Sequence, residues 1–253
     1  MPIVEGNEQV IFLVWKGRPV SVRCAGLESL TEEKVTYIQT AIEEFLVECH
    51  HEFIHYVAVQ ASLDTVRNQL RQGDREGDLI VAFGRPGEQS TLDTRVTWGE
   101  AADFFSEEGE SRGLSGRSFV VLVYALWETV LRPRLAETIG VELSDVRSDI
   151  MGDWRLLRHW LLYRSRRSER NFFARAEGLA TALGSKRNAP EVTPQNIAFL
   201  VRCLDSLEII VDPNGQGLLA TPVTADPATW HQMQQDAQSK GMVPLPLFPK
   251  KPY

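Results

Sequence analysis

Two stretches of the sequence combine residue types that could do chemistry, and the first is the hexapeptide HHEFIH at residues 50–55. Its last five residues fit the pattern H-E-x-x-H, in which two imidazoles one helical turn apart bind Zn²⁺ and the glutamate activates a water molecule. The candidate zinc site therefore consists of His51, Glu52 and His55. A catalytic zinc also needs a third protein ligand, and the x-x-G-x-x-H extension of this motif does not follow His55.

Helical periodicity gives this hexapeptide a second interpretation. Apolar residues recur at spacings of three and four along the surrounding segment: Val35, Ile38, Ile42, Phe45, Cys49, Phe53 and Tyr56. With about 100° between successive residues, His51 and His55 point away from that face and share a stripe with Glu44 and Glu48. Such a stripe is typical of a solvated helix face with weak Glu–His pairing. We favour the solvated face and no bound cofactor; a zinc metallohydrolase remains the alternative.

The second stretch, residues 149–170, gathers cations and aromatic side chains in a chain whose formal net charge is −7. The spacing predicts a helix with one apolar face and one cationic side that carries Arg155, His159, Arg166 and Arg170. The other basic side chains are Arg158, Arg164 and Arg167. Arginines interleaved with Trp160 and Tyr163 suit phosphates and stacked bases, which indicates RNA binding. The alternative is that the arginines pair with glutamates such as Glu128 and Glu137.

The elements that must position these residues are mostly helical. The predicted segments begin with a β-hairpin at 10–24, a helix at 31–70 with Glu32 and Glu33 in its first turn, a short strand at 78–84 and an irregular region at 85–113. They continue with a helix at 116–139 that is kinked near Pro133 and stopped by Gly140, and with a helix at 144–170. Helices at 172–184, 194–209 (capped by Thr193) and 226–239 and a Pro-rich tail complete the chain. The sequence thus predicts a mainly α fold with a small N-terminal β element. We expect a hairpin unit at 1–28, a helical domain at 29–211 and a C-terminal extension at 212–253.

Composition limits the class of protein. With 43% hydrophobic residues in 253, the chain can bury a sizeable core. The acidic balance, 34 acidic against 27 basic residues, argues against a nucleic-acid footprint over the whole surface but allows a local basic patch. Three widely spaced cysteines indicate reduced thiols and a cytoplasmic location. No signal peptide or uninterrupted apolar run of membrane-spanning length is expected from the sequence.

Two motifs in residues 115–170 carry a resemblance to a known family. They are G-x-x-F-V-V-L-V-Y-x-L-W-E at 116–128, followed by R-P-x-L-A at 132–136, and S-D-I-M-G-D-x-R-L-L-R at 148–158. This arrangement resembles prokaryotic members of the HEPN superfamily. The resemblance implies a HEPN-like helical bundle, often homodimeric, of the kind found in toxin–antitoxin and antiviral defence systems. Many such proteins cut RNA without a metal, using an arginine, a polar neighbour and a histidine four to six positions after the arginine.

The resemblance assigns catalytic positions to Arg158, His159 and Tyr163. Arg158 matches the motif arginine and His159 its polar neighbour, but Tyr163 stands where the closing histidine is expected. Histidine titrates near neutral pH whereas tyrosine has a pKa near 10, so the usual proton shuttle for the 2′-hydroxyl is altered. Arg158 retains the charge needed to stabilise a phosphate. Glu128 and Asp153 would orient the arginines, and catalysis stays open.

Three functions therefore compete. The first is a HEPN-like, homodimeric protein that binds or acts on RNA, with an altered nuclease motif; if it is an enzyme, it is a metal-independent endoribonuclease. The second is the zinc hydrolase at residues 51–55. The third is a non-enzymatic interaction module whose Pro-rich tail, with Pro244, Pro246, Pro249 and Pro252, docks a protein partner. None of the three involves a membrane.

Overall fold

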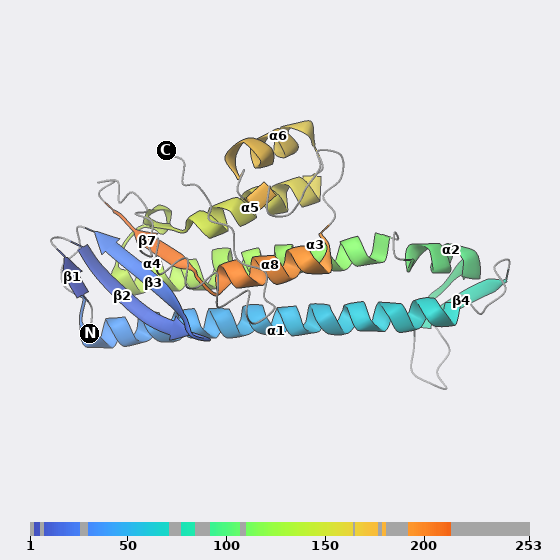
Figure 1. Cartoon of the computed structure of the whole chain (residues 1–253), viewed down its shortest axis with the longest axis horizontal. Helices are drawn as coiled ribbons and strands as arrows, with labels where there is room; N and C mark the ends of the chain where they lie inside the picture. The colour runs from blue at the N-terminus through green and yellow to red at the C-terminus, as the bar shows by residue number, and fades with distance from the viewer. Residues whose placement is uncertain are drawn as a thin grey trace, which may run out of the picture.

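Layered helices make up most of the part of the chain that the structure describes, with a small sheet at one end and strand β4 (Asp78–Phe83) at the other (Figure 1). The computed structural model describes residues 3–5, 8–25, 30–70, 77–83, 92–106, 110–163, 165–176, 179–180 and 192–213. The predicted fold class, mainly α with an N-terminal β-hairpin, is confirmed. The expected helix at 226–239 and the Pro-rich tail lie outside the described residues.

Helix α1, Glu32–Leu70, is the longest element, with 39 residues or about 58 Å. Glu32 and Glu33 in its first turn favour the start of the helix, as the sequence predicted. The buried side chains Ile38, Ile42 and Phe45 belong to the predicted apolar face. The opposite side of α1 faces solvent, and the other elements pack against its buried side (Figure 1).

Three segments form one long rod beside α1: α3 (Glu110–Leu126), the π-helical turn η1 (Trp127–Leu131) and α4 (Arg132–Ile139). The rod runs antiparallel to α1, because Phe45 contacts Trp127 and Phe53 contacts Phe119 at ring-centroid distances of 6.4 and 6.5 Å. Gly140, with φ of 87°, ends it as the sequence predicted.

The expected kink near Pro133 takes the form of the π-turn η1. Proline has no N–H to donate to the carbonyl four residues earlier, so the α-helical ladder is interrupted there. The Arg132 N–H bonds instead to the carbonyl of Trp127, five residues back. The Thr129 hydroxyl meanwhile donates to the carbonyl of Ala125 at 2.8 Å. The wider turn keeps Trp127, Leu131 and Leu135 buried on one side of the rod.

By length and composition alone the rod Glu110–Ile139 is apolar enough to cross a membrane. One side of the rod, however, lies in the protein core: Phe119, Val120, Val123, Trp127 and Leu135 are buried in one cluster with residues of α1 and of helix α5 (Asp149–Tyr163). A long apolar helix with this burial is what the core of a helical protein requires.

The predicted single helix at 144–170 is wrong. The chain instead forms a short 3₁₀ turn (Leu143–Asp145), strand β6 (Val146–Arg147), helix α5 (Asp149–Tyr163) and helix α6 (Arg166–Arg175). Ser165 starts the last helix, because its hydroxyl accepts the N–H of Ser168. Helix α6 then folds back on α5, and Trp160 stacks on Phe172 with 4.9 Å between ring centroids. Burying these two rings together favours the reversal over a straight helix.

The larger sheet has five strands in the order β1-β2-β3-β7-β6, in which β7 is Glu208–Val211. Strands β1 (Ile3–Glu5), β2 (Glu8–Trp15) and β3 (Arg18–Ala25) are antiparallel, and β2 and β3 form the predicted hairpin. Lys16 and Gly17 occupy the hairpin turn with φ of 48° and 78°. Buried residues of this hairpin join the same core as α1, so the hairpin packs on the helices rather than projecting from them.

The predicted helix at 194–209 is wrong at its C-terminal end. Helix α8 spans Pro194–Leu204, with Thr193 as the predicted cap, and residues Glu208–Val211 form strand β7. Strand β7 lies parallel to β3, with Val22 opposite Ile209. β-Branched Ile and Val suit a buried strand, and β3 provides the free edge that a strand needs.

The predicted irregular region at 85–113 is wrong for several described segments. The expected strand at 78–84 is observed as β4 (Asp78–Phe83), and it pairs with β5 (Leu92–Thr97). Helix α2 (Trp98–Phe104) follows, and Thr97 and Glu100 form a reciprocal capping box at its start. Of the helix expected at 172–184, the structure shows the part that belongs to α6.

Candidate functional site

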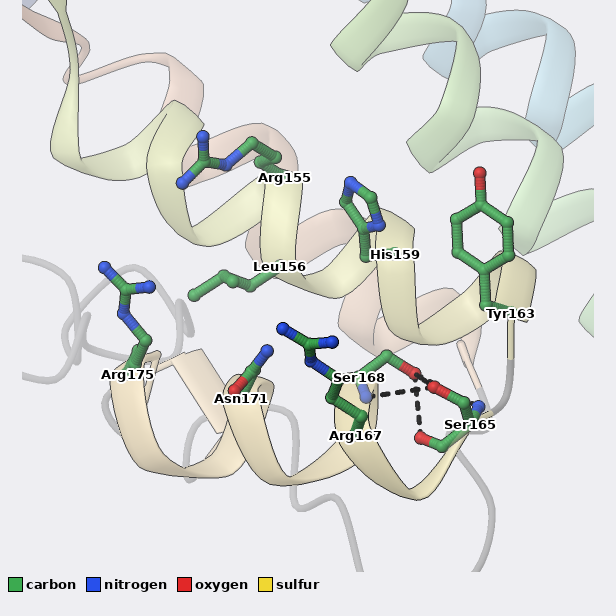
Figure 2. A pocket seen from close by; sticks show the side chains of 9 residues that line it. All are labelled: Arg155, Leu156, His159, Tyr163, Ser165, Arg167, Ser168, Asn171 and Arg175. Carbon is green, nitrogen blue, oxygen red and sulfur yellow. Dashed lines mark hydrogen bonds between the residues drawn. The ribbon is translucent and has the colours of Figure 1, made fainter.

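A cationic groove between α5 and α6 is the best candidate site. Its volume is about 380 Å³, and it is lined by Arg155, Leu156, His159, Tyr163, Ser165, Arg167, Ser168, Asn171 and Arg175. In Figure 2 the side chains of Arg167, Asn171 and Arg175 point from α6 toward α5. Three arginines and a histidine thus line one hollow in a protein of net charge −7.

Helical periodicity on both helices builds the groove. On α5 the residues Arg155, His159 and Tyr163 are spaced by four, and on α6 so are Arg167, Asn171 and Arg175. Residues spaced by four lie on one side of a helix, about 5–6 Å apart. Because α6 folds back on α5, the two polar rows meet along the groove, and Trp160 and Phe172 hold the helices together from their buried sides.

The charges of the groove are not balanced locally. Within the described part of the chain, no carboxylate lines it, and none pairs with Arg155, Arg167 or Arg175. An arginine without a carboxylate partner keeps all five N–H donors for a ligand, and its planar fork matches the oxygens of a phosphate. The groove is therefore suited to a phosphate-bearing ligand.

One end of the groove adds an aromatic surface and a helix terminus. The Tyr163 residue is 64% exposed. Its ring centroid lies 5.4 Å from that of His159, with 32° between the ring planes. Ser165 and Ser168 cap the N-terminus of α6 at the same end, where the helix dipole favours negative charge (Figure 2). An exposed aromatic ring next to anion-favouring groups suits a nucleotide, whose base can stack while its phosphate binds.

Arg158 does not line this groove. Its guanidinium lies over the ring of Tyr124 on α3, 5.3 Å from the ring centroid. The Tyr124 hydroxyl in turn donates to the Glu128 carboxylate at 3.4 Å. Burial, followed by the negative charge of Glu128, raises the pKa of Tyr124, so this hydroxyl keeps its proton. Successive residues on a helix diverge by about 100°, so Arg158 and His159 face different neighbours.

Glu128 and Asp153 were predicted to orient the arginines of α5. Glu128 contacts Tyr124, and among the described residues it makes no ion pair with Arg155 or Arg158. Asp153 is half-buried on α5, and desolvation together with the neighbouring charge of Asp149 raises its pKa to about 7. Among the residues that the structure describes, Asp153 forms no ion pair with Arg155 or Arg158, so its role in orienting them stays a prediction.

The predicted RNA-binding arginines lie at different places relative to the groove. Arg167 lines the groove, and so does Arg155. Arg170 is exposed on α6 without lining it, Arg166 begins α6 with a side chain outside the described set, and Arg164 lies outside the described residues altogether. The cationic side predicted from Arg155, His159, Arg166 and Arg170 assumed a single helix. The chain turns at Ser165, so Arg155 and His159 lie on α5 and Arg170 lies on α6.

Five residues that line the groove were not among the predicted site residues: Leu156, Ser165, Ser168, Asn171 and Arg175. The sequence does contain a pattern that indicates the residues of α6. Ser165, with Ser168 three residues later, marks a helix start, and residues 167, 171 and 175 then recur every four positions on one side of that helix. The continuous helical periodicity through residue 170 concealed that start.

The candidate zinc residues lie on the solvent side of α1. The side chains of His51 and His55 are 62% and 72% exposed, and their nearest carboxylates are Glu48 at 3.8 Å and Glu52 at 4.0 Å. Across the described residues, no three His, Cys, Asp or Glu side chains group closely enough to hold a metal ion. Cys49 on the same helix is buried, and that burial raises the pKa of its thiol, which disfavours the thiolate that zinc would need.

Comparisons with protein-family models, with curated proteins and with solved structures found no match to this chain.

Proposed function

We propose that this protein is an RNA-binding protein of the HEPN-like type and that the α5–α6 groove is its RNA-binding surface. The observation that carries the proposal is the set of three arginines, Arg155, Arg167 and Arg175, that line one groove without a carboxylate partner among the described residues. Phosphate contacts of this kind supply most of the affinity in nucleic-acid binding.

RNA fits the groove better than an isolated phosphate does. Two rows of polar side chains run along it, one on each helix, so a ligand with several phosphates can contact several turns. The exposed Tyr163 ring beside His159 offers a stacking surface, which inorganic phosphate would not use. The resemblance of residues 115–170 to HEPN proteins supports RNA, and a role in a toxin–antitoxin or antiviral defence system, on independent grounds.

The groove favours binding over cleavage. Tyr163 supplies a hydroxyl in place of the imidazole that would shuttle a proton near neutral pH. Arg158 lies against Tyr124 instead of lining the groove with His159 and Tyr163. We therefore expect the protein to bind RNA and leave it intact.

The proposal is tested by removing the two groove arginines of α6. Binding of a fluorescein-labelled single-stranded RNA to the full chain is measured by fluorescence anisotropy at several salt concentrations. We expect the Arg167→Ala/Arg175→Ala variant to bind more weakly and to lower the slope of log K against log salt by about 1.4, since each phosphate contact on a single strand contributes roughly 0.7. Intact RNA at the end of the assay, checked on a gel, agrees with binding without cleavage.

The matched control removes the same charge elsewhere. Lys34 on α1 and Arg147 on β6 are both exposed and lie outside the groove, so Lys34→Ala/Arg147→Ala changes the net charge equally. This control should retain the wild-type salt slope. Equal losses in both variants would show that only overall charge matters and would contradict the groove as the binding surface.

The resemblance also supports a homodimer. Light scattering on the purified full chain should then give twice the mass of 28.5 kDa. A monomeric mass at micromolar concentration would remove this part of the proposal and leave the groove as a site within one chain.

A further inference from the structure

The environment of Arg158 has a feature that the groove does not explain. Its guanidinium lies 5.3 Å from the centroid of the buried Tyr124 ring, and its solvent-shielded Nε has no hydrogen-bond partner among the described residues. An arginine is long and flexible, and holding it in one place costs side-chain entropy that a contact must offset. Here the offsetting contact is an aromatic face, and no carboxylate in the described part of the chain forms an ion pair with the guanidinium.

Tyr124 is itself fixed in place from two sides. Its ring is 3% exposed within the core, and its hydroxyl donates to Glu128 at 3.4 Å. Glu128 lies in the π-turn η1, one helical turn beyond Tyr124 on the same rod. The hydrogen bond therefore orients the ring edge toward η1 and the ring face toward α5, where Arg158 lies.

Charges of both signs surround Tyr124. Burial and the negative charge of Glu128 raise the pKa of its hydroxyl, and the positive charges of Arg155 and Arg132 oppose that rise without cancelling it. The Arg132 Nε already donates to the carbonyl of Val146 at 2.9 Å. Arg155 also lines the α5–α6 groove, so it connects the groove with the surface around Arg158.

We propose that Tyr124 is a positioning residue, whose ring holds the Arg158 guanidinium ready to contact a phosphate of the RNA that lies in the α5–α6 groove. This inference rests on the proposed function. The strand passes from the groove over Arg155 to Arg158, so the phosphate contacts lie on two sides of α5. Tyr124 itself does not touch the ligand and acts through Arg158.

The test uses the full chain and the same labelled single-stranded RNA. Arg158→Ala should lower the salt slope of binding by about 0.7, the contribution of one phosphate contact on a single strand. Tyr124→Leu removes the aromatic face, so it should lower the slope by the same amount. Tyr124→Phe keeps the face and should retain the wild-type slope. The double variant Tyr124→Leu/Arg158→Ala should bind no more weakly than Arg158→Ala, because both changes remove one contact.

If Tyr124 only stabilised the core, its loss would affect RNA binding no differently from the loss of another buried tyrosine. Tyr56 on α1 is a matched control: it is 4% exposed, its hydroxyl has no hydrogen-bond partner within the described ranges, and its ring packs on Phe119. Tyr56→Leu should therefore reduce thermal stability about as much as Tyr124→Leu does, and leave the salt slope at the wild-type value. A slope lowered equally by both variants would overturn the inference, as would additive losses in the double variant.

A readout without RNA covers the case in which Tyr124→Leu folds poorly. The ring current of Tyr124 should shift the Nε–H resonance of Arg158 in a ¹⁵N spectrum of the free protein, and Tyr124→Phe should keep that shift. An Arg158 resonance at the random-coil position in the wild type overturns the inference. RNA binding that depends on Arg167 and Arg175 but not on Tyr124 also overturns it and leaves the proposed function intact. A wild-type chain that binds no RNA overturns both.

Discussion

At the scale of single residues, the half-buried carboxyl group of Asp153 makes the stability of the fold depend on pH. Burial and the charge of Asp149 raise its pKa from 3.8 to about 7. The folded protein thus prefers the protonated carboxyl, whereas the unfolded chain ionises it near its ordinary pKa. Below pH 4 the Asp153 carboxyl is protonated in both states and does not lower the free energy of unfolding. As the pH rises from 4 to 7 the unfolded chain ionises first, so the free energy of unfolding falls, and above pH 7 the loss is complete.

This sign leads to a prediction for Asp153→Asn, which keeps the shape and removes the charge. The variant should unfold at a higher temperature than the wild type at pH 8, and the difference should shrink steadily toward pH 4. Thermal unfolding followed by circular dichroism across this range is the measurement. Parallel curves for the two proteins would contradict the raised pKa.

Asp149→Asn is the control for the same turn. Asp149 is exposed, and its charge is one of the two causes of the shift at Asp153. Without that charge the pKa of Asp153 should be raised less. Stability should still fall with rising pH, but the fall should be complete at a lower pH than in the wild type. The comparison separates the contribution of burial from that of the neighbouring carboxylate.

At the scale of elements, the approach between α3 and the segment before α8 depends on one glycine. A Cβ at Gly116 would lie 2.7 Å from the carbonyl oxygen of Val192, which is a backbone atom and cannot rotate away. We expect Gly116→Ala to lower the free energy of unfolding by about 1–3 kcal/mol, the usual range for an overpacked core. Chemical denaturation at constant temperature measures this change.

A second helical glycine provides the opposite expectation. Gly152 on α5 has nothing within 4 Å of the position that a Cβ would take. Gly152→Ala should therefore raise the free energy of unfolding by about 0.5–1 kcal/mol, because alanine is the better helix former. If both substitutions changed stability in the same direction, the close approach at Gly116 would not be the cause.

The same scale explains why the predicted helix at 144–170 divides. Local periodicity continues through the break, and only Ser165 marks a new start. The reversal that follows buries Trp160 against Phe172 and Phe173. This contact joins residues on two helices and leaves no trace in the periodicity of either one.

At the scale of the whole molecule, strand β7 ties the two ends of the described chain together. It pairs with β3 of the N-terminal hairpin and with β6, which precedes α5. Ile11, Val20, Val22 and Ile209 are buried in the same cluster as the helices. The sheet is therefore part of the core.

Deletion of residues 1–28 should accordingly disrupt the fold as a whole. The truncated chain would expose the edge of β7 and the apolar side chains of α1 that now face the hairpin, so we expect loss of the cooperative thermal transition and increased binding of a hydrophobic dye. Val14→Ser is the control, since Val14 lies in the hairpin with a largely exposed side chain, and it should unfold at the wild-type temperature. A truncated chain that unfolds like the wild type would show that the hairpin is dispensable.

The sequence by itself determined the features that depend on neighbours within a few residues. It predicted the buried face of α1, the solvent-facing row with His51 and His55, the hairpin, the helix ends at Thr193 and Gly140, and the cation-rich region of α5 and α6. These follow from helical and strand periodicity, from turn residues and from caps, all of which act locally.

Only the tertiary structure decided which residues meet. It placed Arg175 and Asn171 opposite Arg155, directed Arg158 to Tyr124, and turned residues 208–211 into a strand beside β3. Each outcome comes from contacts between residues distant in sequence or on different helices: rings that become buried, and a strand edge that needs a partner. Such contacts depend on where the backbone returns, and a periodic pattern along one segment does not contain that information.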